Sequence, residues 1–292
     1  MLFILLAKEG IKMKIIELLE KVTYQCLQGN IETEVEQLVF DSRQVTPNSI
    51  YVCIPGTIVD GHKFIPQAIE AGAKVIVVTK EVKVSNDITV ILVEDARVAL
   101  AYMSAVFFHY PANKMKIIGI TGTKGKTTTA YMMKSILENA GYRVGLIGTI
   151  ETIIGKEHYP SKNTTPESYV IQETFSKMVE EGCDFCVMEV SSQGLMMHRT
   201  DGIDFEIGIF MNLESDHIGP LEHSSFEDYA SAKGRLFKQC KLGIVNQDDE
   251  HWKMVLEGHT CRVETFGFDS SSNLYAHDVQ LINNSGVLGV KY

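Results

Sequence analysis

The feature that most constrains the fold of this chain is a glycine- and threonine-rich string directly after an apolar run. Residues 119–129 read Gly-Ile-Thr-Gly-Thr-Lys-Gly-Lys-Thr-Thr-Thr and follow the apolar pair Ile117 and Ile118. A strand, a tight turn and a helix start form a cradle for an anion, because the turn's amides point inward and the helix N-terminus is partly positive. A lysine in the place of Lys126 meets the β and γ phosphates, and a hydroxyl in the place of Thr127 holds Mg²⁺. The string therefore predicts binding of a nucleoside triphosphate and a metal ion, together with phosphoryl chemistry.

The string departs from the general phosphate-loop pattern at one position. That pattern places a glycine five residues before the glycine of Gly-Lys, and here the place is taken by Ile120. A glycine-rich turn that holds no ligand is the alternative interpretation. Apolar residues at helical spacing after Lys126, with Gly141 as a stop, support a helix in the required place.

Composition narrows the class of protein. A chain of 292 residues is long enough for two domains, and 45% apolar with 22% charged residues is ordinary for a soluble globular protein. The net charge of −10 argues against a nucleic-acid partner. Six cysteines in a chain of this length do not make a disulfide scaffold. We interpret the Cys183-x-x-Cys186 pair as buried thiols, with a zinc site as the alternative.

The N-terminus begins with an apolar run, Met-Leu-Phe-Ile-Leu-Leu-Ala, that is too short to span a bilayer. We expect residues 1–12 to be a non-native or disordered extension and Met13 to be the natural start. With no transmembrane segment visible in the sequence, we expect a cytoplasmic protein without a membrane partner. The oligomeric state is open, and we expect a monomer.

Alternating strand-like and helical runs predict two α/β domains. Residues 13–111 form a small N-terminal domain, and residues 112–292 form a doubly wound, mostly parallel sheet domain whose ligand site lies at the carboxyl ends of its strands. After Gly258 the pattern is rich in strands and ends in a hairpin with its turn at 283–286. The expected strands are 49–54, 73–79, 89–93, 116–121, 144–149, 185–190, 207–213 and 243–246. The expected helices are 13–21, 64–71, 96–108, 126–140, 167–181, 225–238 and 249–257.

Four polar clusters follow predicted strands, and each has a plainer alternative. Glu189 ends an apolar run and can hold Mg²⁺ as a Walker B acid, or it can pair with a lysine. The Asp216-His217 pair can take a metal, or it is a capping or surface pair. The string 163–167, Asn-Thr-Thr-Pro-Glu, offers hydroxyls, or it is a helix cap with proline in the first turn. Lys233 lies on a helical stretch and, taken alone, is a solvated surface lysine.

Together these strings resemble the Mur ligase family. The strings that match are Gly-Thr-Lys-Gly-Lys-Thr-Thr (122–128), Asn-Thr-Thr-Pro-Glu (163–167), Glu-Val-Ser-Ser-Gln-Gly-Leu (189–195), Asn-Leu-x-x-Asp-His (212–217) and Tyr-x-x-x-Lys-x-x-Leu-Phe (229–237). In the first region, Asp41-Ser42-Arg43 and the string 60–65 are similar to the family's uridine-binding domain. The resemblance covers nearly all of residues 13–292.

The resemblance implies a role for each matching residue. The ATP phosphates would be held by Gly122, Thr123, Lys124, Gly125, Lys126, Thr127 and Thr128. The metal ligands would be Thr127, Glu189, His217 and Lys233, the last as a carbamate that turns a cation into an anionic oxygen ligand. The catalytic residues would be Lys126, Glu189, His217 and Lys233. The uridine diphosphate would meet Ser42, Thr57, Ile58 and Val59. The muramoyl-peptide would meet Asn163, Thr164, Thr165, Ser191 and Arg199.

The implied reaction is ATP-dependent amide formation in peptidoglycan synthesis. A diamino acid, L-lysine or meso-diaminopimelate, would be added to UDP-N-acetylmuramoyl-L-alanyl-D-glutamate through an acyl phosphate. Family members carry a third, C-terminal Rossmann-like domain, which we expect to be absent here, with the central domain incomplete. Two alternatives therefore stay open: a truncated, inactive chain that binds these ligands, and a related ligase such as folylpolyglutamate synthetase.

Overall fold

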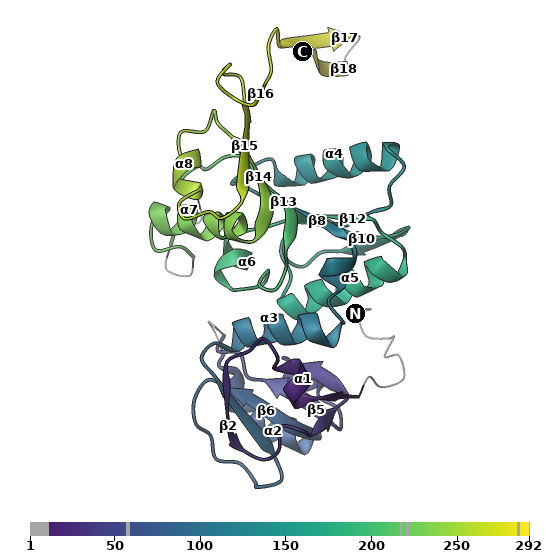
Figure 1. The fold of residues 1–292 in the computed structure, drawn as a ribbon, viewed down its shortest axis with the longest axis vertical. Helices are drawn as coiled ribbons and strands as arrows, with labels where there is room; N and C mark the ends of the chain where they lie inside the picture. The colour runs from purple at the N-terminus through teal and green to yellow at the C-terminus, as the bar shows by residue number, and fades with distance from the viewer. Residues whose placement is uncertain (1–11, 57–58, 217, 220–221, 285–286, 292) are drawn as a thin grey trace. The chain divides into compact units, whose positions relative to one another are not determined.

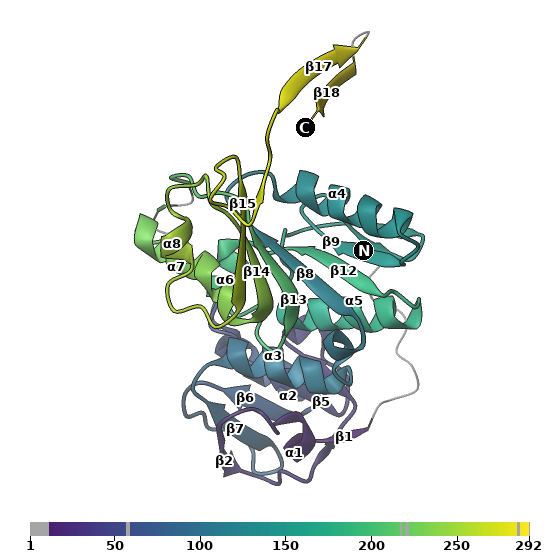
Figure 2. The same cartoon turned by 45° about the horizontal axis from the view of Figure 1, so that its top comes forward.

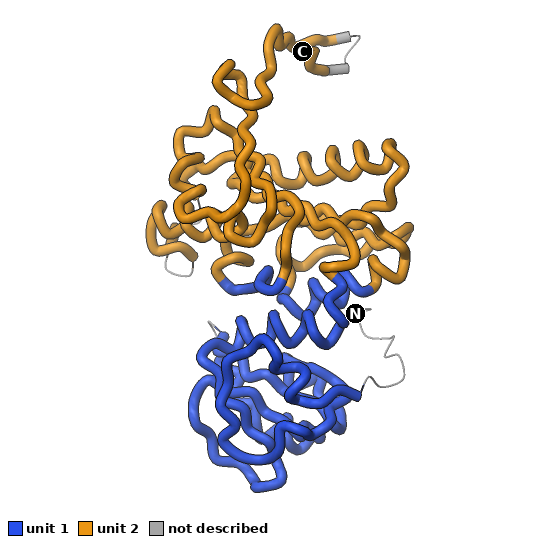
Figure 3. The backbone as a smooth tube through the Cα atoms, in the orientation of Figure 1, with its two compact units in different colours: residues 1–111, 167–176, 197–202 blue, residues 112–166, 177–196, 203–292 orange. Residues whose placement is uncertain are grey.

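The computed structural model describes residues 12–56, 59–216, 218–219, 222–284 and 287–291. The chain divides into two compact units, coloured blue and orange in Figure 3. Unit 1 takes the described residues up to Pro111, together with Glu167–Ser176 and Met197–Gly202, and unit 2 takes the remainder. Two segments that are distant in sequence therefore join the N-terminal unit.

Unit 1 is a small α/β unit. Its described elements are β1 (Met13–Lys14), α1 (Ile15–Leu18), β2 (Tyr24–Gln28), β3 (Glu34–Val35), β4 (Gln37–Val39), the 3-10 helix η1 (Ser42–Gln44), β5 (Ser49–Val52), η2 (Gly61–Phe64), α2 (Ile65–Glu70), β6 (Ala73–Val78), β7 (Thr89–Val93) and α3 (Ala96–Phe107). The main sheet has the order β2-β7-β6-β5-β4, in which only β2 is antiparallel to its neighbour.

Strand alternation in unit 1 builds a core on each face of the sheet, because successive strand residues point to opposite faces. Ile50 and Val52 pack in the cluster that holds the apolar residues of α1 and α3. Tyr51, between them, packs in the second cluster with Ile65 and Ala68 of α2. Figure 1 shows these elements as the purple to blue part of the chain.

The N-terminal segment differs from the expected helix over 13–21. Met13 and Lys14 pair with Val35 and Glu34 in an antiparallel ladder, so only Ile15–Leu18 is left for α1. These pairing partners lie 20 and 22 residues away, and helical periodicity within the segment cannot reveal them.

Unit 2 is built on a larger mixed sheet. Its described elements are η3 (Pro111–Lys114), β8 (Lys116–Thr121), α4 (Lys126–Asn139), β9 (Val144–Ile147), β10 (Glu151–Ile154), β11 (Glu157–Pro160), the end of α5 (Ser168–Glu180), β12 (Phe185–Glu189), α6 (Ser192–Met196), β13 (Phe205–Phe210), α7 (Phe226–Gly234), η4 (Arg235–Lys238), β14 (Cys240–Asn246), α8 (Trp252–Val255), β15 (Arg262–Gly267), β16 (Leu274–Tyr275), β17 (Gln280–Asn284) and β18 (Val287–Lys291). None of the described helices of the chain is long and apolar enough to cross a membrane.

The order of this sheet is β11-β10-β9-β12-β8-β13-β14-β15-β16. Seven neighbouring strands of this sheet run parallel, in the order β9-β12-β8-β13-β14-β15-β16. Beyond β9, the strands β10 and β11 form an antiparallel extension that the sequence patterns did not predict. The parallel part confirms the expected doubly wound arrangement, and several of its strands are labelled in Figure 2. The predicted hairpin at the end of the described chain is also confirmed, as β17 and β18.

The two faces of the sheet in unit 2 are covered differently. Ile118, Ile120 and Val187 form an apolar face with residues of α4. On the other face, Gly119 of β8 pairs with Gly208 of β13. A Cβ added at Gly119 would stand 2.8 Å from the Phe205 ring. Glycine there lets the covering side chains approach the backbone closely.

The chain crosses from one side of β8 to the other within this sheet. It passes from β8 to β9 and β12 on one side and then to β13 and β14 on the other, so β8 stands between β12 and β13. Glu189 at the end of β12 pairs with Ile120, and Phe210 at the end of β13 pairs with Thr121. The carboxyl ends of these three strands therefore meet at a topological switch point, where open α/β sheets bind ligands.

Candidate functional site

The phosphate loop follows β8 at this switch point. Gly122 has φ +150°, and a Cβ there would lie 2.9 Å from the Cβ of Met211. Gly125 has φ +84° and caps α4 without a side-chain hydrogen bond to the first turn. Because the first turn of a helix has no intrahelical acceptors for its amides, the start of α4 presents N–H groups and a partial positive charge.

Asn212, which follows β13, fixes the shape of the loop. Its Oδ1 accepts from the amide of Lys124 at 2.8 Å, and its Nδ2 donates to the Lys124 carbonyl at 3.1 Å. Its backbone carbonyl accepts from the Thr123 amide at 3.0 Å. The amides of Thr123 and Lys124 therefore donate their hydrogen bonds to Asn212. The amides left to bind a phosphate are those from Gly125 onward. The sequence motif contained Asn212, but nothing in it indicated this role.

Lys126 folds back over the loop. Its Nζ donates to the carbonyls of Gly122 at 2.8 Å and Thr123 at 3.0 Å. Burial lowers the pKa of Lys126, while the charges of Glu189 and Asp216 act in the opposite direction. The loop therefore holds a largely desolvated cation beside the start of α4.

Lys233 on α7 approaches the same loop. Its side chain is buried, with 1% of its surface exposed, and its Nζ donates to the Gly122 carbonyl at 3.0 Å. The Nζ also lies 4.3 Å from the centre of the Tyr229 ring, and the Tyr229 hydroxyl lies 3.1 Å from Thr123 Oγ1. Burial first, and then the charge of Lys126, hold the pKa of Lys233 well below its ordinary value. The alternative interpretation of Lys233 as a solvated surface lysine is wrong.

Glu189 is the buried acid of the site and has no exposed surface. Its Oε2 accepts from the hydroxyls of Thr127 and Thr149, each at 2.9 Å. Its Oε1 accepts from the Thr149 amide at 2.9 Å. Gly148 leaves room for this carboxylate, because a Cβ there would stand 2.5 Å from Oε1. Sequence reasoning missed Thr149, whose partner in the chain is 40 residues away.

The donor set around Glu189 fits a hard divalent cation. A carboxylate and the Thr127 hydroxyl that contacts it are oxygen ligands of the kind Mg²⁺ prefers. Within the described ranges no three His, Cys, Asp or Glu side chains gather as metal ligands. Mg²⁺ usually keeps several waters and takes further oxygens from substrate phosphates, so a complete protein cage is not required. His217, the other predicted ligand, lies outside the described residues.

The string 163–167 is attached to the end of β12. The buried Thr165 donates its hydroxyl to the Glu189 carbonyl at 3.0 Å and accepts from the Ser191 amide at 2.9 Å. Thr164 Oγ1 lies 3.1 Å from Thr149 Oγ1, and Asn163 is exposed. Of these residues, Thr165 thus has its hydroxyl proton engaged within the fold, and Thr164 lies on the polar side of the site.

The predicted substrate residues of unit 1 have mixed environments. Ser42 is buried on η1, where its Oγ lies 3.4 Å from Gln67 Oε1, whereas Val59 is 45% exposed. Arg199 forms an ion pair with Glu167 at 2.8 Å. Arg97 pairs with the same carboxylate at 3.1 Å. Thr57 and Ile58, also predicted here, lie outside the described residues.

Asp60 organises the turn after β5. It caps η2 by accepting from the His62 amide at 3.0 Å, and it also accepts from His62 Nδ1 at 2.6 Å and from Lys80 Nζ at 2.7 Å. The hydrogen bond from Lys80 is the main cause that lowers the pKa of Asp60, followed by the bonds from His62. The Thr79 amide donates to His62 Nε2 at 3.1 Å, which fixes the ring.

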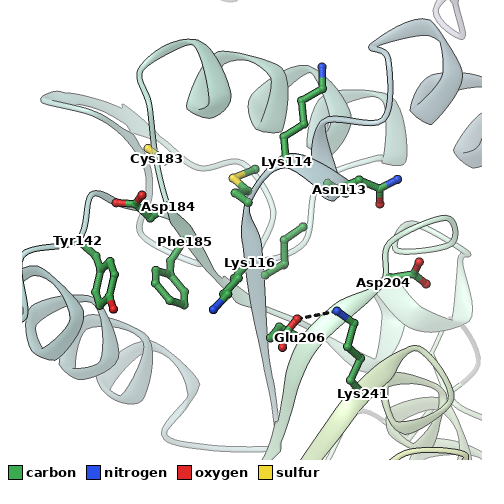
Figure 4. Close-up of a pocket in the computed structure, with 13 residues that line it drawn as sticks. Asn113, Lys114, Lys116, Tyr142, Cys183, Asp184, Phe185, Asp204, Glu206 and Lys241 are labelled. Carbon is green, nitrogen blue, oxygen red and sulfur yellow. Dashed lines mark hydrogen bonds and ion pairs between the residues drawn. The ribbon is translucent and has the colours of Figure 1, made fainter.

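A cavity of about 620 Å³ lies in unit 2 at the amino ends of the strands, away from the phosphate loop. Figure 4 shows it at the amino ends of β8, β12 and β13, with Lys116 beside Phe185 and an ion pair between Glu206 and Lys241 at 2.8 Å. The phosphate loop and Glu189 lie at the carboxyl ends of these strands. This cavity is therefore separate from the candidate site.

Cys183 and Cys186 are buried free thiols, which confirms their interpretation from the sequence. Burial raises the pKa of both thiols. Neutral thiols in apolar surroundings are inert and do not suit a zinc site.

Comparison with known proteins gives matches along most of the chain. A UDP-N-acetylmuramoyl-L-alanyl-D-glutamate–2,6-diaminopimelate ligase of Clostridium perfringens is 44% identical over 91% of this chain and 56% of its own length. The chain thus spans little more than half the length of the curated relatives it matches.

Solved structures share the fold. A structure named for the same kind of ligase has a TM-score of 0.78 and 22% identity, and covers 96% of this chain and 59% of its own. The MurF ligase of Thermotoga maritima in complex with ADP has a TM-score of 0.51 and 19% identity, and covers 87% of this chain and 57% of its own. Both support the α/β architecture of the expected N-terminal and middle domains.

Two family models match separate parts of the chain. The model of the Mur ligase family catalytic domain matches residues 34–108, and that of the Mur ligase middle domain matches residues 120–290. Because the second match alone spans more than half of the chain, this chain belongs to the Mur ligase family.

Proposed function

We propose that this chain binds ATP and a UDP-muramoyl-peptide as part of an ATP-dependent ligase. The ligase adds a diamino acid to UDP-N-acetylmuramoyl-L-alanyl-D-glutamate in peptidoglycan synthesis. The observation that carries the proposal is the meeting of Lys126, Thr127 and the buried Glu189 at the switch point. The names of its relatives favour 2,6-diaminopimelate over L-lysine. In this proposal the protein works in the cytoplasm as a monomer, with residues 13–111 as the UDP-binding domain.

The proposed roles follow from the chemistry of the two steps. The D-glutamate carboxylate attacks the γ-phosphorus, which forms an acyl phosphate and releases ADP. The neutral amine then attacks the acyl carbon and loses a proton, and the tetrahedral intermediate breaks its C–O bond to release phosphate. The amides at the start of α4 and Lys126 would bind and orient the phosphates, and donors already fixed in place are effective at stabilising developing charge. Thr127 and Glu189 would hold Mg²⁺, which supplies neutralisation of phosphate charge when bound.

Lys233 is proposed to act as a carbamate. Its buried amine would add to CO₂, forming an N–C bond and losing one proton, so that an anionic oxygen ligand replaces an ammonium. As an ammonium, Lys233 shares the Gly122 carbonyl with the cation of Lys126. A carbamate would exchange this repulsion for attraction and would add hard oxygen atoms to a metal site.

The test separates binding from turnover. Calorimetry measures binding of Mg·ATP and of UDP-N-acetylmuramoyl-L-alanyl-D-glutamate, and ADP release is then followed with diaminopimelate or L-lysine. We expect both ligands to bind, and Glu189→Gln to weaken Mg·ATP binding. If the parent binds neither ligand, the proposal is wrong.

Two further outcomes identify the alternatives. Binding of both ligands without ADP release would support a chain that binds but does not turn over. ADP release that depends on a folate with glutamate, instead of the UDP ligand and a diamino acid, would support a folylpolyglutamate synthetase. Lys134, which lies on α4 and pairs with Glu138 at 2.6 Å, provides a matched control as Lys134→Ala.

A further inference from the structure

A line of polar groups runs from the start of α4 to the string 163–167. Thr127 and Thr149 both contact Oε2 of Glu189 at 2.9 Å, and Thr149 also lies 3.1 Å from the hydroxyl of Thr164. The Thr149 amide anchors the other carboxylate oxygen at 2.9 Å. Thr149 follows β9 and is exposed, so its hydroxyl stands between the buried acid and the solvent side of the site.

The donor roles along this line are fixed by the chemistry of the groups. An ionised carboxylate only accepts, so the single hydroxyl proton of Thr149 goes to Glu189. The contact between Thr149 and Thr164 then requires the proton of Thr164. With its only proton pointed at Thr149, Thr164 presents lone pairs to an incoming ligand. Phosphate, carboxylate and carbonyl oxygens need a donor, and Thr164 in this arrangement is not one.

We propose that Thr149 is a positioning residue that couples the metal and nucleotide site to the donor capacity of Thr164. The inference rests on the proposed function, in which Glu189 holds Mg²⁺ and Thr164 meets the UDP-muramoyl-peptide. A cation at Oε2 of Glu189 would occupy a lone pair of that oxygen and draw its charge away, which weakens the hydrogen bonds that Thr127 and Thr149 donate to it. The Thr149 proton then turns to Thr164, and the Thr164 proton turns to an oxygen of the substrate. Hydroxyl groups rotate in this change, and no covalent bond forms or breaks.

The coupling has a thermodynamic consequence. A cation and nucleotide at Glu189 strengthen binding of the substrate through Thr164, and by linkage the substrate strengthens binding of the cation and nucleotide by the same factor. Couplings of this kind are typically on the order of 5–150-fold in affinity. A merely structural role of Thr149 would change the stability of the fold and leave this factor alone.

The experiment measures the dissociation constant of UDP-N-acetylmuramoyl-L-alanyl-D-glutamate by calorimetry, with and without saturating Mg²⁺ and a non-hydrolysable ATP analogue. We expect a coupling of at least about fivefold in the parent. Thr149→Val and Thr164→Val should each abolish it, and the double variant should lose nothing more. Thr149→Ser keeps the hydroxyl and should keep the coupling.

A matched control is Thr260→Val, because Thr260 is also exposed but precedes β15 at the opposite edge of the sheet. It should keep the full coupling, and thermal unfolding of Thr149→Val checks that this variant is folded at the temperature of the titration. Full coupling in Thr149→Val, or additive losses in the double variant, would overturn the inference. If the parent protein binds both ligands without coupling, the inference about Thr149 is wrong and the proposed function still stands. A parent that binds neither ligand rejects the proposed function itself.

Discussion

Replacing Lys126 by alanine tests the phosphate loop most directly. In the free chain the ammonium donates to the two neutral carbonyls of Gly122 and Thr123. On binding ATP it would exchange these acceptors for phosphate oxygens. Burial has already lowered its pKa, so much of the cost of desolvating this cation is met by the fold before the nucleotide arrives.

The size of the effect follows from one charge-assisted contact. A hydrogen bond to a charged group contributes about 1.5–3 kcal/mol. Since 1.4 kcal/mol is tenfold in affinity, Lys126→Ala should weaken Mg·ATP binding by about 10–150-fold. The fold should persist, because removing the cation also removes its repulsion with Lys233. For the same reason the pKa of Lys233, which the charge of Lys126 lowers, should rise in this variant.

Isothermal titration calorimetry with Mg·ATP gives the affinity, and thermal unfolding reports the fold. Lys134→Ala is the matched control, because Lys134 lies two turns further along α4 and its ammonium pairs with Glu138. A helix pair of this kind contributes about 0.3–0.5 kcal/mol to stability, so the Mg·ATP affinity should change by less than about fivefold. An unchanged affinity in Lys126→Ala, or an equal loss in Lys134→Ala, would refute the assignment of Lys126 to the phosphates.

Two further predictions concern unit 1. Ser42→Trp should block binding of UDP-N-acetylmuramoyl-L-alanyl-D-glutamate by bulk while leaving Mg·ATP affinity unchanged, as measured by calorimetry; binding as tight as in the parent would place the uridine site elsewhere. Lys80→Met should lower the free energy of unfolding at pH 7 by about 0.2–1 kcal/mol, because it removes an exposed pair. Because the pKa of Asp60 is lower in the folded chain than its ordinary value of 3.8, the ionised Asp60 stabilises the fold at pH values above 3.8. This contribution is lost as the pH falls through the folded pKa. The difference between parent and Lys80→Met in urea unfolding should therefore shrink below about pH 4, and a difference that grows on acidification would contradict this reasoning.

The elements predicted well are those whose signal is local. The apolar run at Lys116–Thr121, the glycine turn and the helical spacing after Lys126 lie next to one another in the chain, and the structure has the strand and helix there. β7 at Thr89–Val93 is likewise bounded as predicted. In each case one stretch of sequence carries the whole pattern.

The missed elements depend on partners elsewhere in the chain. β10 and β11 form a hairpin across Gly155, whose φ is +57°, but their residues continue the polar and apolar mixture around them. The strand pair that displaced the N-terminal helix is missed for the same reason. Local propensity is a weak guide when pairing decides the outcome.

The site was predicted in its parts and not in its connections. Glu189 and Lys126 were identified by type and position, and both lie at the switch point. Thr149, which lies outside every matching string, holds the Glu189 carboxylate. Asn212 and Tyr229 belong to matching strings, but the strings did not indicate that these residues contact the phosphate loop. Side-chain contacts between strand ends are set by sheet order, and sheet order is not visible in any single motif.

Lys233 provides the last and most discriminating prediction. A buried ammonium beside the cation of Lys126 costs free energy, and its lowered pKa favours the neutral amine that reacts with CO₂. With ¹³C-labelled bicarbonate, the parent should show a carbamate carbon by NMR, and Lys233→Ala should lack it. The variant should also bind Mg²⁺ and ATP more weakly, and a short carboxylic acid in the buffer should restore part of that affinity by filling the vacant place. Lys238→Ala is the control, because Lys238 lies on η4, one turn beyond α7. A carbamate signal that persists in Lys233→Ala, or equal metal and nucleotide affinity with and without the lysine, would mean that the buried amine serves packing alone.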